Sequence, residues 1–192
     1  MNKLSYIFML AVVAVSVSCR QNEFPKPHSY FRISFPEKEY TTYSGNCPFV
    51  FEYPVYGKIT PLPNHTDEPC LFNITFPAYK GTLHLTYKEI NHNLDTLLND
   101  DWTFVFKKIA QKADAIDPHN YADHAGKVYA TIYDIKGNAA SPINFYVTDS
   151  VRHFLRGSFY FTTQPNYDSL APAIQFFRKD VIHLVENFKW KN

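Results

Sequence analysis

The chain has 192 residues, with 19 Lys or Arg and 18 Asp or Glu, so its formal net charge is +1 at pH 7. This balance gives no broad electrostatic attraction for nucleic acid, and the sequence has no long run of basic or acidic residues. Phe and Tyr are frequent, with 17 and 14 copies, which favours a sheet-rich protein with a large apolar core.

Residues 1–18 have the pattern of an export signal. Lys3 gives a positive start, residues 4–17 carry no charge, and small residues precede Cys19. The apolar core is too short for a permanent membrane span, which needs about 20 apolar residues. We expect a lipoprotein signal peptide with the lipid on Cys19, although Ser16 stands where a bacterial lipobox usually has Leu. The alternative is an ordinary secretory signal that happens to contain a cysteine.

The rest of the chain divides into a tether and a domain. Residues 19–29 are expected to form a lipidated tether, because Pro25 and Pro27 favour an extended, semi-rigid path. Residues 30–192 are long enough for a single domain with a sizeable core.

Two further cysteines, Cys47 and Cys70, make an even pair in an exported protein. A disulfide between them would add about 3 kcal/mol on the chain-entropy model. The proline-rich segment between them would benefit from such a bridge, so we favour it over two separate buried thiols.

Strand patterns recur along the domain. Tyr30–Phe35 alternates moderately, Phe49–Tyr53 and Leu71–Phe76 are rich in aromatic and β-branched residues, and Thr82–Tyr87 alternates polar and apolar positions. Short, turn-rich links predict a later antiparallel meander of three strands, over Lys127–Lys136, Ile143–Thr148 and His153–Thr162.

Two segments have helical periodicity instead. Residues 94–116 place apolar side chains three and four positions apart, at Leu94, Leu97, Leu98, Trp102, Val105, Phe106, Ile109 and Ala113. A last helix is predicted with Asp168 or Ser169 as its N-cap and Pro172 in its first turn. Its expected buried positions are Ile174, Phe177, Val181, Leu184, Val185 and Phe188. The predicted fold class is α+β, a mainly antiparallel sheet with a central and a C-terminal helix packed on it.

Many short sequence blocks occur in a fixed order. The most specific are Gly137-Asn138-Ala139-Ala140-Ser141, Thr148-Asp149-Ser150 and His153-Phe154-Leu155-Arg156-Gly157, and earlier ones include Cys47-Pro48-Phe49 and Phe51-Glu52-Tyr53-Pro54. Together they resemble the GldD family of gliding-motility lipoproteins over essentially the whole mature chain, least over residues 89–111. The resemblance implies an accessory role in the gliding and type IX secretion apparatus of Bacteroidota, without established enzymatic activity.

The densest polar cluster comprises Asp114, Asp117, His119, Asp123 and His124. Histidine with carboxylates can bind zinc, but this spacing matches no metal motif, and a helix end followed by a solvated loop is the simpler interpretation. The sequence also lacks a glycine loop that could cradle phosphates. We therefore expect neither a metal nor a cofactor.

A hydrolase would need a base beside a nucleophile, and Ser150 with Asp149 and His153 has the residue types. A turn explains these neighbours better, because Asp and Ser hydrogen-bond their own backbone. We expect no catalytic residues and no enzymatic activity.

Arg152, Phe154 and Arg156 would share one face of a strand, and the region from Asn138 to Arg156 is our candidate partner-contact surface. Two alternatives remain open. The arginines could lie on a solvated face, or Arg156 could pair with a buried carboxylate, for which Asp149 is the first candidate.

Three tripeptides resemble the Asp-Ser/Thr-aliphatic signal for O-glycosylation of exported Bacteroidota proteins. They would carry the sugar on Thr96, Ser150 and Ser169. A helix cap or turn is the alternative interpretation of each.

These observations lead to one interpretation and one alternative. We expect a lipid-anchored, non-enzymatic component of the gliding or type IX secretion apparatus that contacts other envelope proteins of that machinery. The alternative is a membrane-anchored periplasmic enzyme or ligand-binding module. Arg20 and Gln21 do not resemble the acidic surface-export tag of many lipoproteins of this phylum, which favours a periplasm-facing anchor, on the outer rather than the inner membrane.

Overall fold

A computed structural model describes residues 33–62 and 70–191. The strands are β1 (Tyr40–Tyr43), β2 (Phe49–Pro54), β3 (Lys58–Pro61), β4 (Leu71–Phe76), β5 (Gly81–Glu89), β6 (Ala113–Asp123), β7 (Val128–Gly137), β8 (Ile143–Thr148), β9 (His153–Phe161) and β10 (Lys189–Trp190). The helices are η1 (Pro77–Tyr79), α2 (Leu94–Thr103), the π-helix η2 (Phe104–Lys108), the 3-10 helix η3 (Ile109–Lys112) and α3 (Tyr167–Glu186). The expected signal peptide, Cys19 and the tether lie outside the described residues.

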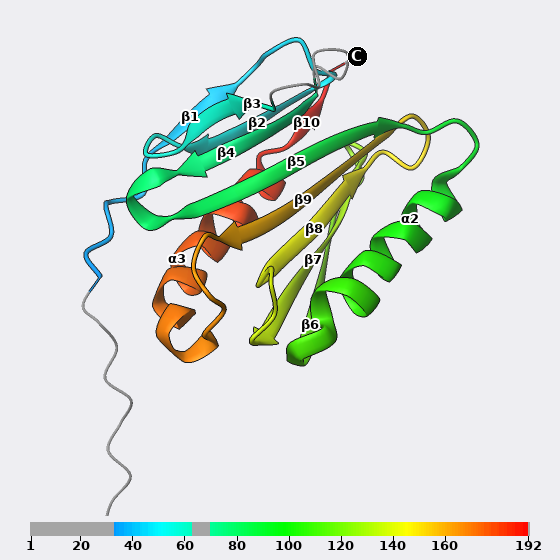
Figure 1. The fold of residues 1–192 in the computed structure, drawn as a ribbon. Coiled ribbons are helices and arrows are strands. Elements are labelled where there is room, and N and C mark those ends of the chain that lie inside the picture. The colour runs from blue at the N-terminus through cyan, green and yellow to red at the C-terminus, as the bar shows by residue number, and fades with distance from the viewer. Residues whose placement is uncertain (1–32, 63–69, 192) are drawn as a thin grey trace, which may run out of the picture.

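The strands form two antiparallel sheets. Seven of them lie in the order β3-β4-β5-β9-β8-β7-β6, and β1-β2-β10 form a smaller sheet. Figure 1 shows α3 on one side of the large sheet and α2 on the other. This arrangement confirms the predicted α+β class with a central and a C-terminal helix. The predicted meander is also confirmed, because β7, β8 and β9 are consecutive neighbours.

The main core lies between the large sheet, α3 and β2. Along β9, Leu155 and Phe159 point into this core and are 0% and 1% exposed. Gly157 lies between them, and a Cβ there would come within 2.2 Å of the Phe145 ring of β8. Glycine therefore lets the aromatic ring of one strand cover its neighbour, and intervening residues such as Arg156 face the α2 side.

The central helix is shorter than predicted. Residues 94–116 were expected to be one helix, but the helix ends at Lys112 and Ala113 begins β6. The helix ends there because the chain pairs with β7 instead. Ala113 lies opposite Gly137, and the sheet provides hydrogen-bond partners for its backbone groups. The polar segment that follows is therefore an edge strand rather than a solvated loop. An edge strand tolerates Pro118 and exposed charges because one side of its backbone needs no partner strand.

Two further predictions need correction. Residues 33–35 are irregular, so the strand predicted over Tyr30–Phe35 does not form there, and the Phe35 ring instead stacks on Phe176 of α3. The N-cap of α3 is Asn166, whose side chain accepts a hydrogen bond from the Ser169 N–H. The helix consequently begins earlier than expected, and Pro172 lies beyond its first turn.

A disulfide joins Cys47 and Cys70, as expected, with their Cα atoms 5.5 Å apart. Cys47 precedes β2 of the small sheet and Cys70 precedes β4 of the large sheet, so the bond links the two sheets beside the main core. Both cysteines are buried.

A buried polar cluster attaches the start of the described chain to α3. The Lys38 ammonium donates to the Asp180 carboxylate at 2.8 Å, and the hydroxyls of Tyr40 and Tyr56 donate to the same carboxylate. Burial lowers the pKa of Lys38, and the hydrogen bond and charge of Asp180 oppose that shift. Burial and the same carboxylate raise the pKa of both tyrosines, which therefore stay neutral.

Candidate functional site

The side of the large sheet that α2 covers has a smaller buried apolar cluster than the α3 side. We call α2, η2, η3 and the strands beneath them the α2 face. A small cluster attaches the helix there, with Val105 and Ile109 packed against residues of β7 and the loop that follows it. Val105 is fully buried in the π-helix η2. Such π-helical turns are rare and occur frequently at functional sites.

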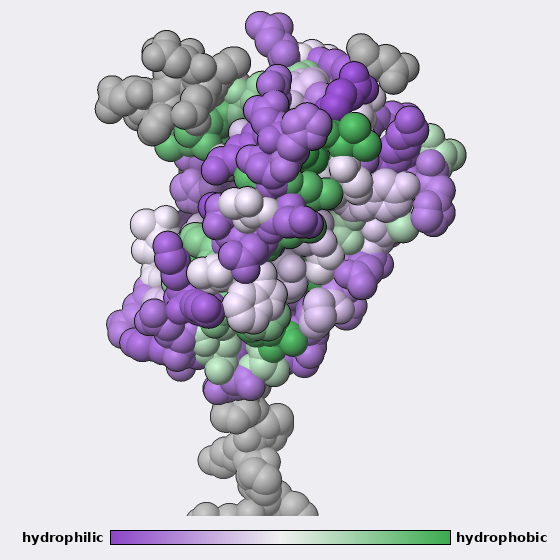
Figure 2. Space-filling model, turned by 90° about the vertical axis from the view of Figure 1, so that its right-hand side faces the viewer, coloured by the Kyte–Doolittle hydropathy of each residue, from purple (hydrophilic) through white to green (hydrophobic). Residues whose placement is uncertain are grey.

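Two aromatic side chains lie exposed on this helix. Trp102 is 46% exposed and Phe106 is 36% exposed, and their rings stack with centroids 5.2 Å apart. The Lys107 ammonium lies 5.4 Å from the centroid of the Trp102 ring, and the Phe106 ring meets Tyr133 edge-on. Periodicity had assigned both aromatic residues to the buried helix face, which is wrong. In Figure 2, hydrophobic side chains appear among hydrophilic ones on this side of the molecule.

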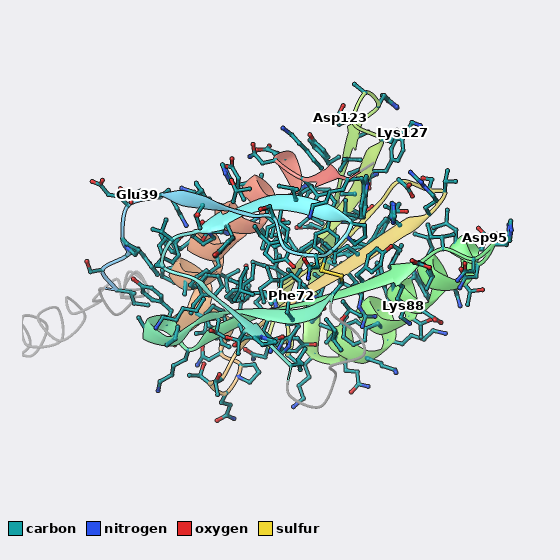
Figure 3. The ribbon with its side chains drawn as sticks, turned by 90° about the horizontal axis from the view of Figure 1, so that it is seen from above. Glu39, Phe72, Lys88, Asp95, Asp123 and Lys127 are labelled. Atoms are coloured by element: carbon teal, nitrogen blue, oxygen red, sulfur yellow. A yellow bond between two sulfur atoms is a disulfide. The ribbon has the colours of Figure 1, made fainter. Side chains whose placement is uncertain are left out.

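A pocket of about 270 Å³ opens between η2 and the strands β5 and β9. Its lining is one cation, one imidazole, two aliphatic hydroxyls, one phenol and one phenyl ring, contributed by Arg156, His84, Thr86, Ser158, Tyr160 and Phe104. A smaller cavity of about 50 Å³ lies next to it, where Arg156, Lys88 and Asp100 are among the lining residues. Figure 3 shows Lys88 on β5 beside α2. Burial lowers the pKa of His84, so its imidazole is neutral at pH 7.

Arg156 is held by an aromatic ring rather than by a carboxylate. Its guanidinium carbon lies 4.2 Å from the centroid of the Phe104 ring, a cation–π contact. No salt bridge or hydrogen bond of the Arg156 side chain occurs within residues 33–62 and 70–191. The proposed pair with Asp149 is therefore wrong.

The Asp149 carboxylate instead stabilises the turn between β8 and β9. One of its oxygens accepts hydrogen bonds from the backbone N–H groups of Val151, Arg152 and His153, at 2.7–3.0 Å. Burial alone would raise the pKa of Asp149, but these backbone donors outweigh burial and lower the pKa.

Asp101 is the most unusual group on the α2 face. It is 1% exposed, and neither carboxylate oxygen has a hydrogen-bond partner in the described part of the chain. Burial raises the pKa of Asp101 to about 6, and the positive charge of Arg156 opposes that rise only in part. A buried carboxyl with a raised pKa is typical of functional sites.

Comparison with known proteins identifies the family. The family model described as gliding motility lipoprotein GldD matches residues 20–190. The chain belongs to this family. No curated protein matches the sequence. The solution structure of cyanobacterial PsbP (CyanoP) from Synechocystis sp. PCC 6803 aligns over 83% of this chain and 97% of its own, with 11% identity and a TM-score of 0.48.

Membership of the GldD family supports association with the cell envelope. None of the helices within residues 33–62 and 70–191 is both long and apolar enough to cross a membrane. The lipid candidate Cys19 lies outside the described residues, so its modification stays a prediction.

The predicted contact residues do not form one surface in this GldD-family chain. Phe154 and Arg156 both line the small cavity beside the pocket, but Phe154 is only 3% exposed. Arg152 is exposed in the turn before β9, and Asn138 follows β7, where its side chain accepts a hydrogen bond from the Tyr167 N–H. Sequence reasoning placed Arg156 and Phe154 near the site but missed His84, Asp101 and Trp102, whose roles depend on which strands become neighbours.

The polar residues considered for metal binding are spread along β6, except His124, which lies in the turn that follows it. The His119 Nε2 lies 3.0 Å from a carboxylate oxygen of Asp134, and Asp117 forms a salt bridge with Lys136 at 2.6 Å, so both residues contact β7. Within the two described ranges, no three His, Cys, Asp or Glu side chains gather into a metal-binding group.

The three glycosylation candidates are all exposed. Thr96 lies in the first turn of α2, Ser150 lies in the β8–β9 turn with φ +66°, and Ser169 lies in the first turn of α3. The neighbouring His153 ring hydrogen-bonds Tyr87 through Nδ1, at 2.7 Å, rather than Ser150. This geometry agrees with a turn around Ser150, and glycosylation of the three sites stays a prediction.

Proposed function

We propose that the protein is a lipid-anchored, non-enzymatic accessory component of the gliding and type IX secretion apparatus, acting through contacts with other envelope proteins. Membership of the GldD family supports the link to gliding. The observation that carries the contact role is the exposed Trp102–Phe106 pair on the α2 face.

Aromatic residues are costly to expose and are enriched in the centres of protein interfaces. In this chain the Trp102 indole is stacked on Phe106 and covered in part by Lys107, which pre-orders it without burying it. A pre-ordered aromatic side chain loses little conformational entropy on binding, so its apolar area contributes more fully to affinity.

Replacing Trp102 by Ala is expected to reduce recovery of crosslinked partners by about tenfold, the loss typical of a central interface aromatic. The measurement is crosslinking in native cells followed by mass spectrometry. Stability should stay nearly unchanged because the indole is 46% exposed.

The matched control is Val55→Ala, which removes an exposed apolar side chain from the turn after β2 and should leave recovery unchanged. Equal recovery from the Trp102 variant would reject this contact surface. Recovering no gliding or secretion component from the unmodified chain would reject the proposed function itself.

The proposed anchor has its own test. Cys19→Ser should move the protein from the membrane to the soluble fraction and abolish acyl labelling, because the lipid chains supply the membrane affinity. Fractionation with radiolabelled fatty acid checks both effects. Separating inner and outer membranes then tests our expectation of a periplasm-facing anchor on the outer membrane. Membrane retention of the variant would contradict the anchor.

A ligand-binding module is the second candidate function. The pocket beside Arg156 favours it, since a cation, a neutral imidazole and hydroxyl groups converge there.

A further inference from the structure

Several hydrogen-bond donors that line the pocket between η2, β5 and β9 have no acceptor in the described part of the chain. The side chains of Arg156, His84 and Thr86 all line it, and none of them makes a hydrogen bond within residues 33–62 and 70–191. The His84 ring meets Tyr160 edge-on, with centroids 5.3 Å apart, which fixes the imidazole against the pocket wall. Polar groups that converge on a cavity without partners within the protein are suited to bind a polar ligand.

The cation of this pocket is pre-oriented. The Arg156 guanidinium carbon lies over the face of the Phe104 ring, 4.2 Å from its centroid, and the N–H groups of this side chain donate to no acceptor within residues 33–62 and 70–191, so they are left for a ligand. A planar guanidinium offers two parallel N–H groups that match the two oxygens of a carboxylate. Contact with an aromatic face also restricts the side chain before any ligand arrives, which lowers the entropy cost of binding.

The charge of the pocket matches a singly charged anion. Among the described residues, Arg156 is the one cation that lines it, His84 is neutral at pH 7, and no carboxylate lines it. Asp101 acts on Arg156 electrostatically, but it is 1% exposed and is not part of the lining. One formal positive charge and several neutral donors suit a carboxylate better than a doubly charged phosphate.

The size of the pocket limits what can carry this carboxylate. A volume of about 270 Å³ is at the lower end of small-molecule sites. It therefore suits a small organic acid or the end of a peptide, and it is too small for a drug-sized ligand. We propose that this pocket is a carboxylate-binding site, in which Arg156 anchors the carboxylate and His84 and Thr86 donate further hydrogen bonds.

The test is saturation-transfer NMR on the full-length protein in detergent micelles. Propionate and the tripeptide Gly-Gly-Ala supply the two carboxylate sources, and propionamide and the C-terminally amidated tripeptide are their uncharged controls. We expect binding of a carboxylate but not of its amide. Binding of propionate would indicate a free organic acid, and binding of the tripeptide alone would indicate a peptide terminus.

Two variants should change this binding in opposite directions. Arg156→Gln should weaken it roughly tenfold, since it removes the charge-assisted hydrogen bonds. Asp101→Asn should strengthen it about twofold, because it removes a negative charge that acts on Arg156. The matched control is Arg152→Gln, which removes an exposed arginine that does not line the pocket.

The proposal is overturned if neither carboxylate binds, if acids and amides bind equally, or if Arg156→Gln binds as tightly as the unmodified chain. A folded Asp101→Asn variant with unchanged or weaker affinity would also count against it. These results are independent of the Trp102 crosslinking experiment, since Trp102 does not line the pocket.

Discussion

Asp180→Asn is expected to lower the free energy of unfolding by about 3 kcal/mol, because it leaves a partly buried ammonium without its counter-charge. Asp180 is 4% exposed and accepts hydrogen bonds from Lys38, Tyr40 and Tyr56. The Lys38 side chain is only 25% exposed, so water can replace the carboxylate only in part. After the substitution, the Lys38 ammonium keeps only neutral acceptors, which are the Phe176 carbonyl, the Tyr56 hydroxyl and the new amide oxygen.

The measurement is the melting temperature, followed by near-ultraviolet circular dichroism. For a domain of this size, about 3 kcal/mol corresponds to a fall of roughly 6–12 °C. Glu186→Gln is the matched control, since it neutralises an exposed carboxylate near the end of the same helix and should shift melting by much less. A fall no larger than that of the control would show that the cluster contributes no net stability.

The polar cluster around Lys38 and Asp180 could not be predicted from the sequence. Lys38 and Asp180 are 142 positions apart, and nothing in their local sequence marks either one as buried. They meet because α3 packs between the two sheets while the chain preceding β1 runs along it. Interactions of this kind depend on the complete topology, whereas periodicity reports only on neighbours along the chain.

The strands of the meander were predictable because their burial pattern repeats locally along the sequence. In β8, Ile143, Phe145 and Val147 alternate with more polar residues because one face of the strand packs on the main core. The edge strand β6 has no such face, and most of its residues are exposed or half-buried. The charged residues of β6 therefore have the composition of a loop. The helical spacing of apolar residues before them continues past Lys112, so the helix was predicted to end later than it does.

The candidate site was predictable only in part. Arg156 stood out because an aromatic residue lies two positions before it on the same strand face, but its partner was assigned wrongly. Phe104 holds it, and Phe104 belongs to a helix far away in the sequence. Trp102 and Phe106 fitted a buried stripe, yet the π-helical turn and the narrow contact with β7 leave them at the surface.

Asp101→Asn is expected to stabilise the protein at neutral and alkaline pH, and the sign follows from proton binding. The folded pKa of about 6 lies above the ordinary value of 3.8, so between these values the folded state binds more protons than the unfolded state. The free energy of unfolding therefore falls as pH rises through this window, by at most about 3 kcal/mol for a shift of this size. Asn cannot ionise, so the variant avoids this loss.

The experiment compares melting temperatures of the unmodified chain and the variant from pH 4 to pH 8. The variant should gain about 2 kcal/mol, or roughly 4–8 °C, at pH 8 and differ little at pH 4, where the buried carboxyl is neutral. Asp100→Asn is the matched control, because Asp100 is exposed and its substitution should produce no comparable gain between these limits. A gain that is equal at both pH values would mean that the ionised form of Asp101 is not destabilising. In that case a partner other than the described side chains, such as bound water, must satisfy its carboxylate.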